Sequence, residues 1–302
     1  MKTGWYHLGA LLIVLVWGTT FLSTKMLLLN GLSPENIFFC RFLIATVGIW
    51  FFGKSQWFAN SVKDELLLVL LGVCGGSLYF VCENSALNIT QTANVALIVC
   101  TAPLITAILS HLMLPSDKLN RFVVQGSLVS LLGVALVAFN GHLVLKINPL
   151  GDFLSLVAAL TWAIYTIVLK QLSYRYSSLF ITRKVFIYGL ITILPSFFFH
   201  PVGVAAVLLR PVVWGNLLYL GIVASLLCYF LWNIIVKRIG VIRTTNYIYI
   251  VPLVALVAGV IALDEVITPV AIVGALLILS GVIWAGRKQT EKRSSKGIHP
   301  LV

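Results

Sequence analysis

Long apolar stretches recur along this 302-residue chain, and they constrain its fold more than any other feature. A helix needs about 20 mainly apolar residues to cross the hydrocarbon core of a bilayer. Each stretch has about that length, and none alternates polar and apolar residues as membrane β-strands do. We therefore predict an all-α polytopic membrane protein. The expected spans are residues 7–29, 35–53, 66–87, 92–114, 122–140, 152–170, 178–199, 213–236, 244–263 and 268–286.

The composition points to the same class. The apolar set AVILMFWYC makes up 60% of the residues, charged residues make up 10%, and the mean hydropathy is +1.04. Soluble domains carry about 25% charged residues. The five cysteines lie in apolar stretches without metal-ligand spacing, and the sequence has no phosphate-binding loop and no catalytic motif. We expect no enzyme, no metal and no cofactor.

The distribution of Lys and Arg predicts the orientation. Fifteen of these residues fall in segments on the same side of the membrane as the N-terminus, and two fall in the loops on the other side. Because basic loops stay in the cytoplasm, we expect a multi-pass protein of a bacterial inner membrane, with both termini cytoplasmic and a basic tail over 287–302. The scattered charges form no stripe for nucleic acid. The fifteen are Lys2, Lys54, Lys63, Lys118, Arg121, Lys170, Arg175, Lys237, Arg238, Arg243, Arg287, Lys288, Lys292, Arg293 and Lys296.

The two halves of the chain resemble each other, over residues 7–140 and 150–286. Each half contains five expected spans, so the second must enter the membrane from the opposite side. Inverted repeats of this kind are typical of secondary transporters, which hold their substrate near mid-membrane between the halves. The aligned positions include Trp17 and Trp162, Lys25 and Lys170, Arg41 and Arg183, Gly72 and Gly221, Asn84 and Asn233, Pro103 and Pro252, Gly126 and Gly274, and Gly133 and Gly281.

These features resemble the EamA-type members of the drug/metabolite transporter superfamily. The resemblance implies a permease that moves small metabolites such as amino acids, as an exporter, by alternating access around a mid-membrane cavity. A membrane-embedded enzyme or a channel-like protein for lipid-linked or small polar substrates is the alternative. Whether it works as a monomer or a homodimer stays open. The motifs are WGTTF at 17–21, Arg41-Phe42, SALNITQTANVALIVCTAPLITAIL at 85–109, the Pro252 helix, and Asp264-Glu265 before the Gly274 and Gly281 helix.

Three charged residues lie inside the expected spans at a similar depth: Lys25, Arg41 and Glu83. Charges within a bilayer are costly and mark either a buried pair or a functional site. We favour an ion pair of Glu83 with Lys25 or Arg41. The alternatives are an outer gate or substrate contact, and proton coupling through Glu83. The repeat places Trp232 opposite Glu83, so the shared fold does not require the carboxylate.

Aromatic residues and two prolines complete the predicted substrate site. In related transporters the helices that carry these aromatic residues line the cavity, which would suit a small-molecule substrate. The prolines lie in mid-span, where they remove a backbone donor and bend the helix. We expect them to shape the cavity, with a kink used only for packing as the alternative. The residues are Trp17, Tyr79, Trp162, Tyr165, Tyr229, Tyr247, Pro103 and Pro252.

Overall fold

The structure, a computed structural model, describes residues 3–53, 56–114, 120–139, 148–198, 207, 210–263 and 268–294. Within these ranges the secondary structure is helical, without strands, and 10 segments are long and apolar enough to cross a membrane. The prediction of ten spans is confirmed. The segments are Gly4–Leu29, Pro34–Phe52, Val62–Ile89, Thr92–Met113, Arg121–Ala138, Pro149–Ser173, Ser178–Phe198, Pro211–Ile239, Val241–Ala258 and Pro269–Gly286.

Several spans are built from more than one helix, because short π-helical or 3₁₀ stretches interrupt them. Asp264-Glu265 and the end of the basic tail, 295–302, lie outside the described residues. The α-helices are α1 (Gly4–Leu29), α2 (Pro34–Ile49), α3 (Val62–Gly72), α4 (Leu78–Ile89), α5 (Thr92–Val99), α6 (Ala102–Met113), α7 (Arg121–Phe139), α8 (Pro149–Ser173), α9 (Ser178–Ile193), α10 (Pro211–Leu218), α11 (Cys228–Ile239), α12 (Val241–Thr245), α13 (Val251–Leu263) and α14 (Pro269–Ser294).

Polar residues next to the apolar stretches fix where helices begin. Ser33 accepts a hydrogen bond from the backbone N–H of Asn36 at 3.3 Å, and Pro34 is the first residue of α2. Ser177 caps α9 in the same way, through the N–H of Phe180 at 3.2 Å. A capping side chain satisfies a backbone donor that the first helical turn leaves free, and proline suits the first turn because it lacks that donor. The local sequence therefore sets these helix starts at the ends of short connections.

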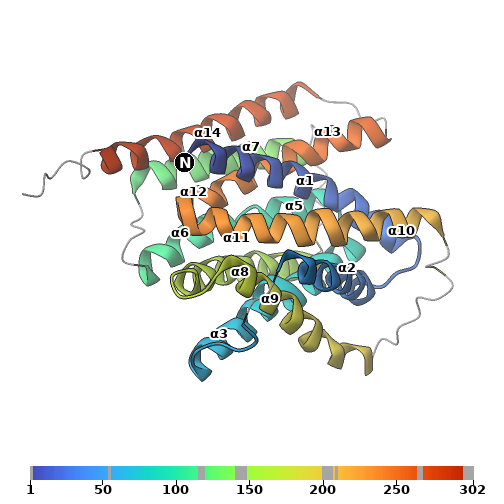
Figure 1. Cartoon of the computed structure of the whole chain (residues 1–302). Helices are drawn as coiled ribbons and strands as arrows, with labels where there is room; N and C mark the ends of the chain where they lie inside the picture. The colour runs from blue at the N-terminus through green and yellow to red at the C-terminus, as the bar shows by residue number, and fades with distance from the viewer. Residues whose placement is uncertain are drawn as a thin grey trace, which may run out of the picture.

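The fifth and tenth spans pack against each other through glycines. Helices α7 and α14 lie side by side (Figure 1). A Cβ atom on Gly126 would lie 2.5 Å from the carbonyl oxygen of Gly281, and one on Gly133 would lie 2.5 Å from that of Gly274. Only residues without a side chain allow this backbone approach. The repeat aligns Gly126 with Gly274 and Gly133 with Gly281. The internal symmetry therefore relates the contact of Gly126 with Gly281 to the contact of Gly133 with Gly274.

The first helix of each half packs against the other half. Helix α1 contacts α11 and α13, and α8 contacts α4, α5 and α6. At one of these crossings a Cβ atom on Gly18 would lie 2.3 Å from Cβ of Val254, so only glycine leaves room there for the Val254 side chain. The N-terminal end of α1 and the C-terminal end of α14 lie at the same end of the bundle (Figure 1). The core between the halves is therefore shared by both of them.

Candidate substrate site

The fourth and ninth spans are interrupted directly before their prolines. Helix α5 ends at Val99 and α6 begins at Ala102, with Pro103 as its second residue. In the ninth span a 3₁₀ stretch, Asn246–Ile250, precedes α13, whose second residue is Pro252. A proline in mid-helix clashes with the preceding turn and removes a hydrogen bond, whereas the first turn of a new helix accepts it. The bends expected at both prolines are thus breaks between two helices.

The third and eighth spans are also irregular, near the middle of their length. They contain π-helical stretches, Val73–Ser77 and Tyr219–Leu227, and Gly76 has non-helical backbone angles. The hydroxyl of Tyr229 donates a hydrogen bond of 2.6 Å to the carbonyl oxygen of Gly75. Within a membrane, irregular backbone is tolerated where protein groups satisfy it or where it lines a cavity. The four irregular spans therefore mark the middle of the bundle as the place for a site.

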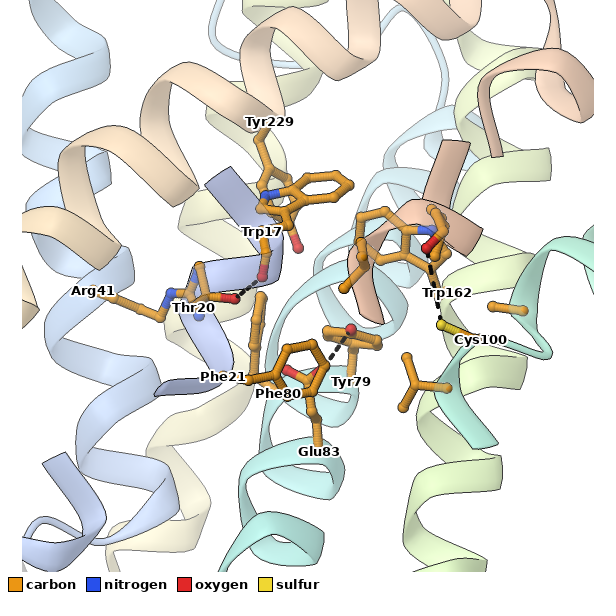
Figure 2. Close-up of a pocket in the computed structure, with 14 residues that line it drawn as sticks. Trp17, Thr20, Phe21, Arg41, Tyr79, Phe80, Glu83, Cys100, Trp162 and Tyr229 are labelled. Atoms are coloured by element: carbon orange, nitrogen blue, oxygen red, sulfur yellow. Dashed lines mark hydrogen bonds between the residues drawn. The ribbon is translucent and has the colours of Figure 1, made fainter. Parts of the chain in front are cut away.

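A cavity lies at this place, between the two halves of the chain (Figure 2). The volume of the cavity is about 50 Å³. Its wall is mostly apolar and aromatic, with one buried cation and one buried carboxylate. The residues that line it are Trp17, Thr20, Phe21, Arg41, Tyr79, Phe80, Glu83, Val99, Cys100, Ala102, Trp162, Tyr229, Ile248 and Val251.

The two aligned tryptophans meet at the centre of the aromatic wall. Trp17 and Trp162 pack edge to face with ring centroids 5.3 Å apart. Trp232 lies 4.8 Å from Trp17 and 6.1 Å from Trp162 by the same measure. Tyr229 packs against both aligned tryptophans as well, at 6.2 and 5.9 Å. Aromatic pairs prefer such tilted and edge-to-face geometries, so the cluster forms a well-defined apolar surface beside the cavity.

Arg41 and Glu83 bring opposite charges to this cavity from different helices. The Nε of Arg41 donates to the hydroxyl of Ser225 at 2.9 Å, and its guanidinium carbon lies 4.2 Å from the ring centre of Phe80. Glu83 accepts a hydrogen bond of 2.7 Å from the hydroxyl of Tyr79, one turn before it on the same helix. Both side chains are buried, at 3% and 9% exposure.

The predicted ion pair of Glu83 with Arg41 or Lys25 is not formed. Among the residues that the structure describes, no Lys or Arg nitrogen lies within 4.0 Å of the Glu83 carboxylate. Arg41 turns instead to Ser225 and Phe80. Lys25 donates to the carbonyl oxygen of Leu87 at 2.8 Å. The favoured interpretation of these three charges was therefore wrong, because each has found a different partner.

Lys25 caps a helix rather than lining the cavity. Leu87 lies in the last turn of α4, where backbone carbonyls lack partners and the helix dipole is negative. Its repeat counterpart does the same: Lys170 donates to the carbonyl oxygens of Val236 and Lys237 in the last turn of α11, at 3.3 and 3.1 Å. This shared contact accounts for a lysine at both positions.

Two of the aromatic residues expected in the cavity lie elsewhere. Tyr165 is fully buried against Trp162, with ring centroids 5.1 Å apart, and its hydroxyl donates to the side-chain oxygen of Asn233 at 2.7 Å. Tyr247 is hydrogen-bonded to the ring of His7 at 2.8 Å. His7 lies near the start of α1, so Tyr247 belongs to that end of the bundle and not to the central cavity. The helices that carry them were correctly chosen, but not the helix faces.

Other cavity residues were not found from the sequence. Phe80 follows Tyr79 and stacks against the Arg41 guanidinium, which only the folded arrangement of the helices makes visible. Cys100 and Ile248 lie on the interrupted stretches that precede the two prolines. The prolines were the signal that could have found them, because a broken helix exposes the residues at the break.

A second polar cluster joins the two halves at the end of the bundle where α3 begins. Asp64 forms an ion pair with Arg175 and accepts a hydrogen bond of 2.8 Å from the hydroxyl of Tyr176. Burial, together with the hydrogen bond to the Asp64 carboxylate, raises the pKa of Tyr176, so this hydroxyl stays a neutral donor. One residue further on, Glu65 pairs with Lys184. We call these five residues the α3 end cluster.

Comparison with known proteins identifies the chain. The sequence pattern of the EamA-like transporter family matches residues 4–139 and 149–287. The chain belongs to this family. It is therefore a membrane transporter and not an enzyme, which confirms the resemblance seen in the sequence and rejects the enzyme alternative.

Curated relatives of this EamA-like chain cover nearly its whole length. An "Uncharacterized transporter" of Archaeoglobus fulgidus is 28% identical over 94% of this chain and 98% of its own. A "Probable amino-acid metabolite efflux pump" of Escherichia coli is 28% identical over 90% and 92%. A "Probable terminal-alkyne amino-acid exporter" of Streptantibioticus cattleyicolor is 26% identical over 93% of both chains. A solved crystal structure with 20% identity, covering 98% of this chain and 100% of that one, has a TM-score of 0.75 and shares the fold.

Proposed function

We propose that this transporter exports small metabolites such as amino acids by alternating access around the central cavity. The observation that carries the proposal is the cavity itself, which both halves of the chain line and which four interrupted spans surround. Two relatives bear the names "Probable amino-acid metabolite efflux pump" and "Probable terminal-alkyne amino-acid exporter". A mid-membrane site between two similar halves is what alternating access requires.

The two repeats, 7–140 and 150–286, supply the movement in this proposal. Inverted copies can exchange conformations, which closes the cavity on one side as it opens on the other. The breaks before Pro103 and Pro252 allow the two parts of the fourth and ninth spans to tilt independently. Trp162, Tyr229 and Cys100 in the cavity wall are no more than 5% exposed, so the cavity is largely shut off from solvent in the described state.

The α3 end cluster closes one side in the same proposal. Its acidic residues lie on α3 in the first half, and its basic residues lie in the second half, on the connection before α9 and on α9 itself. Opening the bundle at this end requires separating both ion pairs. The Lys and Arg distribution supports a cytoplasmic position for this side, and the proposal places both termini in the cytoplasm of a bacterial cell. A substrate to be exported would enter here.

Transport is driven by the substrate gradient or by a coupled ion, since the sequence carries no nucleotide-binding loop. The protein is a candidate for proton coupling because a carboxylate, Glu83, lies in the cavity wall. It acts in the inner membrane on a small-molecule substrate, as a monomer or a homodimer.

Counterflow into proteoliposomes tests the proposal. Vesicles containing the purified protein are loaded with one unlabelled amino acid or nucleoside at a time, and uptake of the labelled compound is followed with and without a proton gradient. We expect uptake above empty vesicles for a subset of amino acids. Uptake equal to that of empty vesicles for the whole panel would refute the function. A dependence on the gradient would show coupling.

A further inference from the structure

The cavity holds two buried opposite charges that do not pair with each other. Arg41 and Glu83 both line it, on helices α2 and α4, and they attract each other without an ion pair within 4.0 Å. Buried charges in proteins are normally paired, because an unpaired charge in an apolar surrounding is strongly unfavourable. The space between these two is therefore suited to a ligand that pairs with both.

Arg41 is held so that the end of its side chain is available. Ser225 accepts from Nε and Phe80 lies against the guanidinium plane. In the described part of the chain, the two terminal nitrogens of Arg41 donate no hydrogen bond to protein. Each of them keeps some accessible surface, so a ligand can reach it. A guanidinium fork with free terminal nitrogens binds a carboxylate through two parallel hydrogen bonds.

Glu83 has one oxygen in use and one available. Tyr79 donates to Oε1, which fixes the carboxylate. No side chain or backbone group among the described residues donates to Oε2. This oxygen also keeps some accessible surface. An ammonium group carries three donors and no acceptor, so it satisfies this oxygen and neutralises the carboxylate in one contact.

The repeat shows that the fold does not need this arrangement. Trp232 occupies the position of Glu83 in the second half. The counterpart of Arg41 is Arg183, which stacks at 4.4 Å on Trp50 and donates to the carbonyl oxygen of Gly53 at 2.7 Å, away from the cavity. The second half therefore folds in the same way without a charge pair at the cavity.

We propose that Arg41 and Glu83 form the head-group site for a zwitterionic substrate, with the guanidinium on its carboxylate and Glu83 on its ammonium group. The proposal rests on the proposed transport function and names its substrate class. Trp17, Trp162 and Val251 form the apolar wall beside the two charges, so the substrate is an amino acid with an apolar side chain. A simple amine or a simple carboxylate leaves one buried protein charge unpaired, which selects against both.

Binding to the purified protein tests the site, and tryptophan fluorescence can follow it because Trp17 and Trp162 lie in the cavity wall. The probes are L-leucine and L-phenylalanine, together with their amine-only analogues isopentylamine and phenethylamine and their acid-only analogues 4-methylpentanoate and 3-phenylpropionate. For the wild type we expect at least tenfold tighter binding of the amino acids than of either analogue. Equal binding of an amino acid and one of its analogues would overturn the proposal.

Charge-removing variants should change the preference in opposite directions. Glu83→Gln should lose at least tenfold in amino-acid affinity and shift the preference toward the acid-only analogues. Arg41→Gln should lose as much and shift it toward the amines. Arg183→Gln is the matched control, since it removes the aligned buried arginine outside the cavity, and it should leave the order of affinities unchanged. Unchanged leucine binding by Glu83→Gln would overturn the ammonium contact and would leave proton coupling as the role of Glu83.

Two further measurements keep the result decisive. Arg41→Lys and Glu83→Asp retain the charges, so they should preserve the preference for amino acids at reduced affinity even if the neutral variants fail to fold. Counterflow in proteoliposomes separates this proposal from the transport function. If the wild type transports only compounds that are not zwitterions, the transport function stands and the head-group site is overturned.

Discussion

In the proposed orientation, removing the cation of one ion pair in the α3 end cluster should open the cavity toward the cytoplasm. Lys184 pairs with Glu65, and their side chains are only 8% and 21% exposed. Replacing Lys184 with Met keeps the length and the apolar contacts of the side chain and removes its charge. Glu65 retains donors in Tyr188 and in the backbone N–H of Ala59, so the carboxylate is not stranded and the variant should fold.

The size of the effect follows from the contacts that are lost. A hydrogen bond to a charged group contributes about 1.5–3 kcal/mol. If the pair exists only while the cytoplasmic side is closed, its loss favours the open state by the same free energy. The ratio of open to closed molecules should then rise about 10- to 150-fold.

Cys100 provides the assay, because it lines the cavity and is 2% exposed in the described state. In inside-out vesicles, its labelling by a membrane-impermeant thiol reagent should be faster in Lys184→Met than in the parent protein. Arg210→Met is the control: Arg210 donates to Asn30 at 3.2 Å at the opposite end of the bundle, and its loss should not accelerate labelling from this side. The other cysteines, Cys40, Cys74, Cys82 and Cys228, are first replaced with Ala.

One pattern of results would refute this reasoning. If Lys184→Met lowers the Tm while the labelling rate of Cys100 stays at the parent value, the pair stabilises the bundle in every conformation and does not close the cytoplasmic side. The double variant Glu65→Gln, Lys184→Met gives an independent check. Because the two residues are in contact, their effects on the labelling rate should be non-additive. Additive effects would contradict a shared role in closure.

Three further predictions concern topology, the prolines and the lysine cap. Gln91→Cys should react with an impermeant thiol reagent in intact cells and Gln56→Cys only after permeabilisation, since both are exposed on connections at opposite ends; the reverse pattern would invert the orientation. Replacing Pro103 and Pro252 together with Ala should lower transport more than folding yield, and normal transport would show the breaks to be incidental. Lys25→Met should lower the Tm by about 1–2 °C for a lost cap of about 1 kcal/mol, with substrate preference unchanged; a changed preference would restore its role as a gate.

The spans could be predicted because the signal is local. A helix that crosses the bilayer must be apolar over its whole length, so the sequence alone determines where α1 or α8 lies. The repeat aligned Gly126 with Gly274 and Gly133 with Gly281, but the sequence did not show that α7 and α14 would pack together through these glycines. Pro103 and Pro252 indicated where the helices break.

The partners of the charged residues could not be predicted, because they depend on how each helix is rotated. Lys25, Arg41 and Glu83 lie at similar depths, and depth suggested that they pair. Neighbouring positions on a helix point about 100° apart, as 3.6 residues per turn requires, so equal depth does not imply contact. The same rotation directs Tyr247 to His7 and leaves Phe80 against Arg41.

The internal repeat nevertheless contains a signal that separates charges of the fold from charges of the site. Lys25 and Lys170 occur in both halves, and both cap the last turn of a helix. Glu83, by contrast, aligns with Trp232. The same alignment places Trp214 opposite Glu65 and Phe42 opposite Lys184.

A charge that only one half carries cannot be needed for the fold that both halves share. Of the three such charges, Glu83 lines the cavity, and Glu65 and Lys184 join the halves at one end. Arg41 shows the limit of this rule, because Arg183 matches it in type and in stacking on an aromatic ring, yet only Arg41 reaches the cavity. For arginine the distinction lies in what each guanidinium faces. Exchanging both arginines for Gln in turn, as proposed for the head-group site, therefore tests the rule where it is weakest.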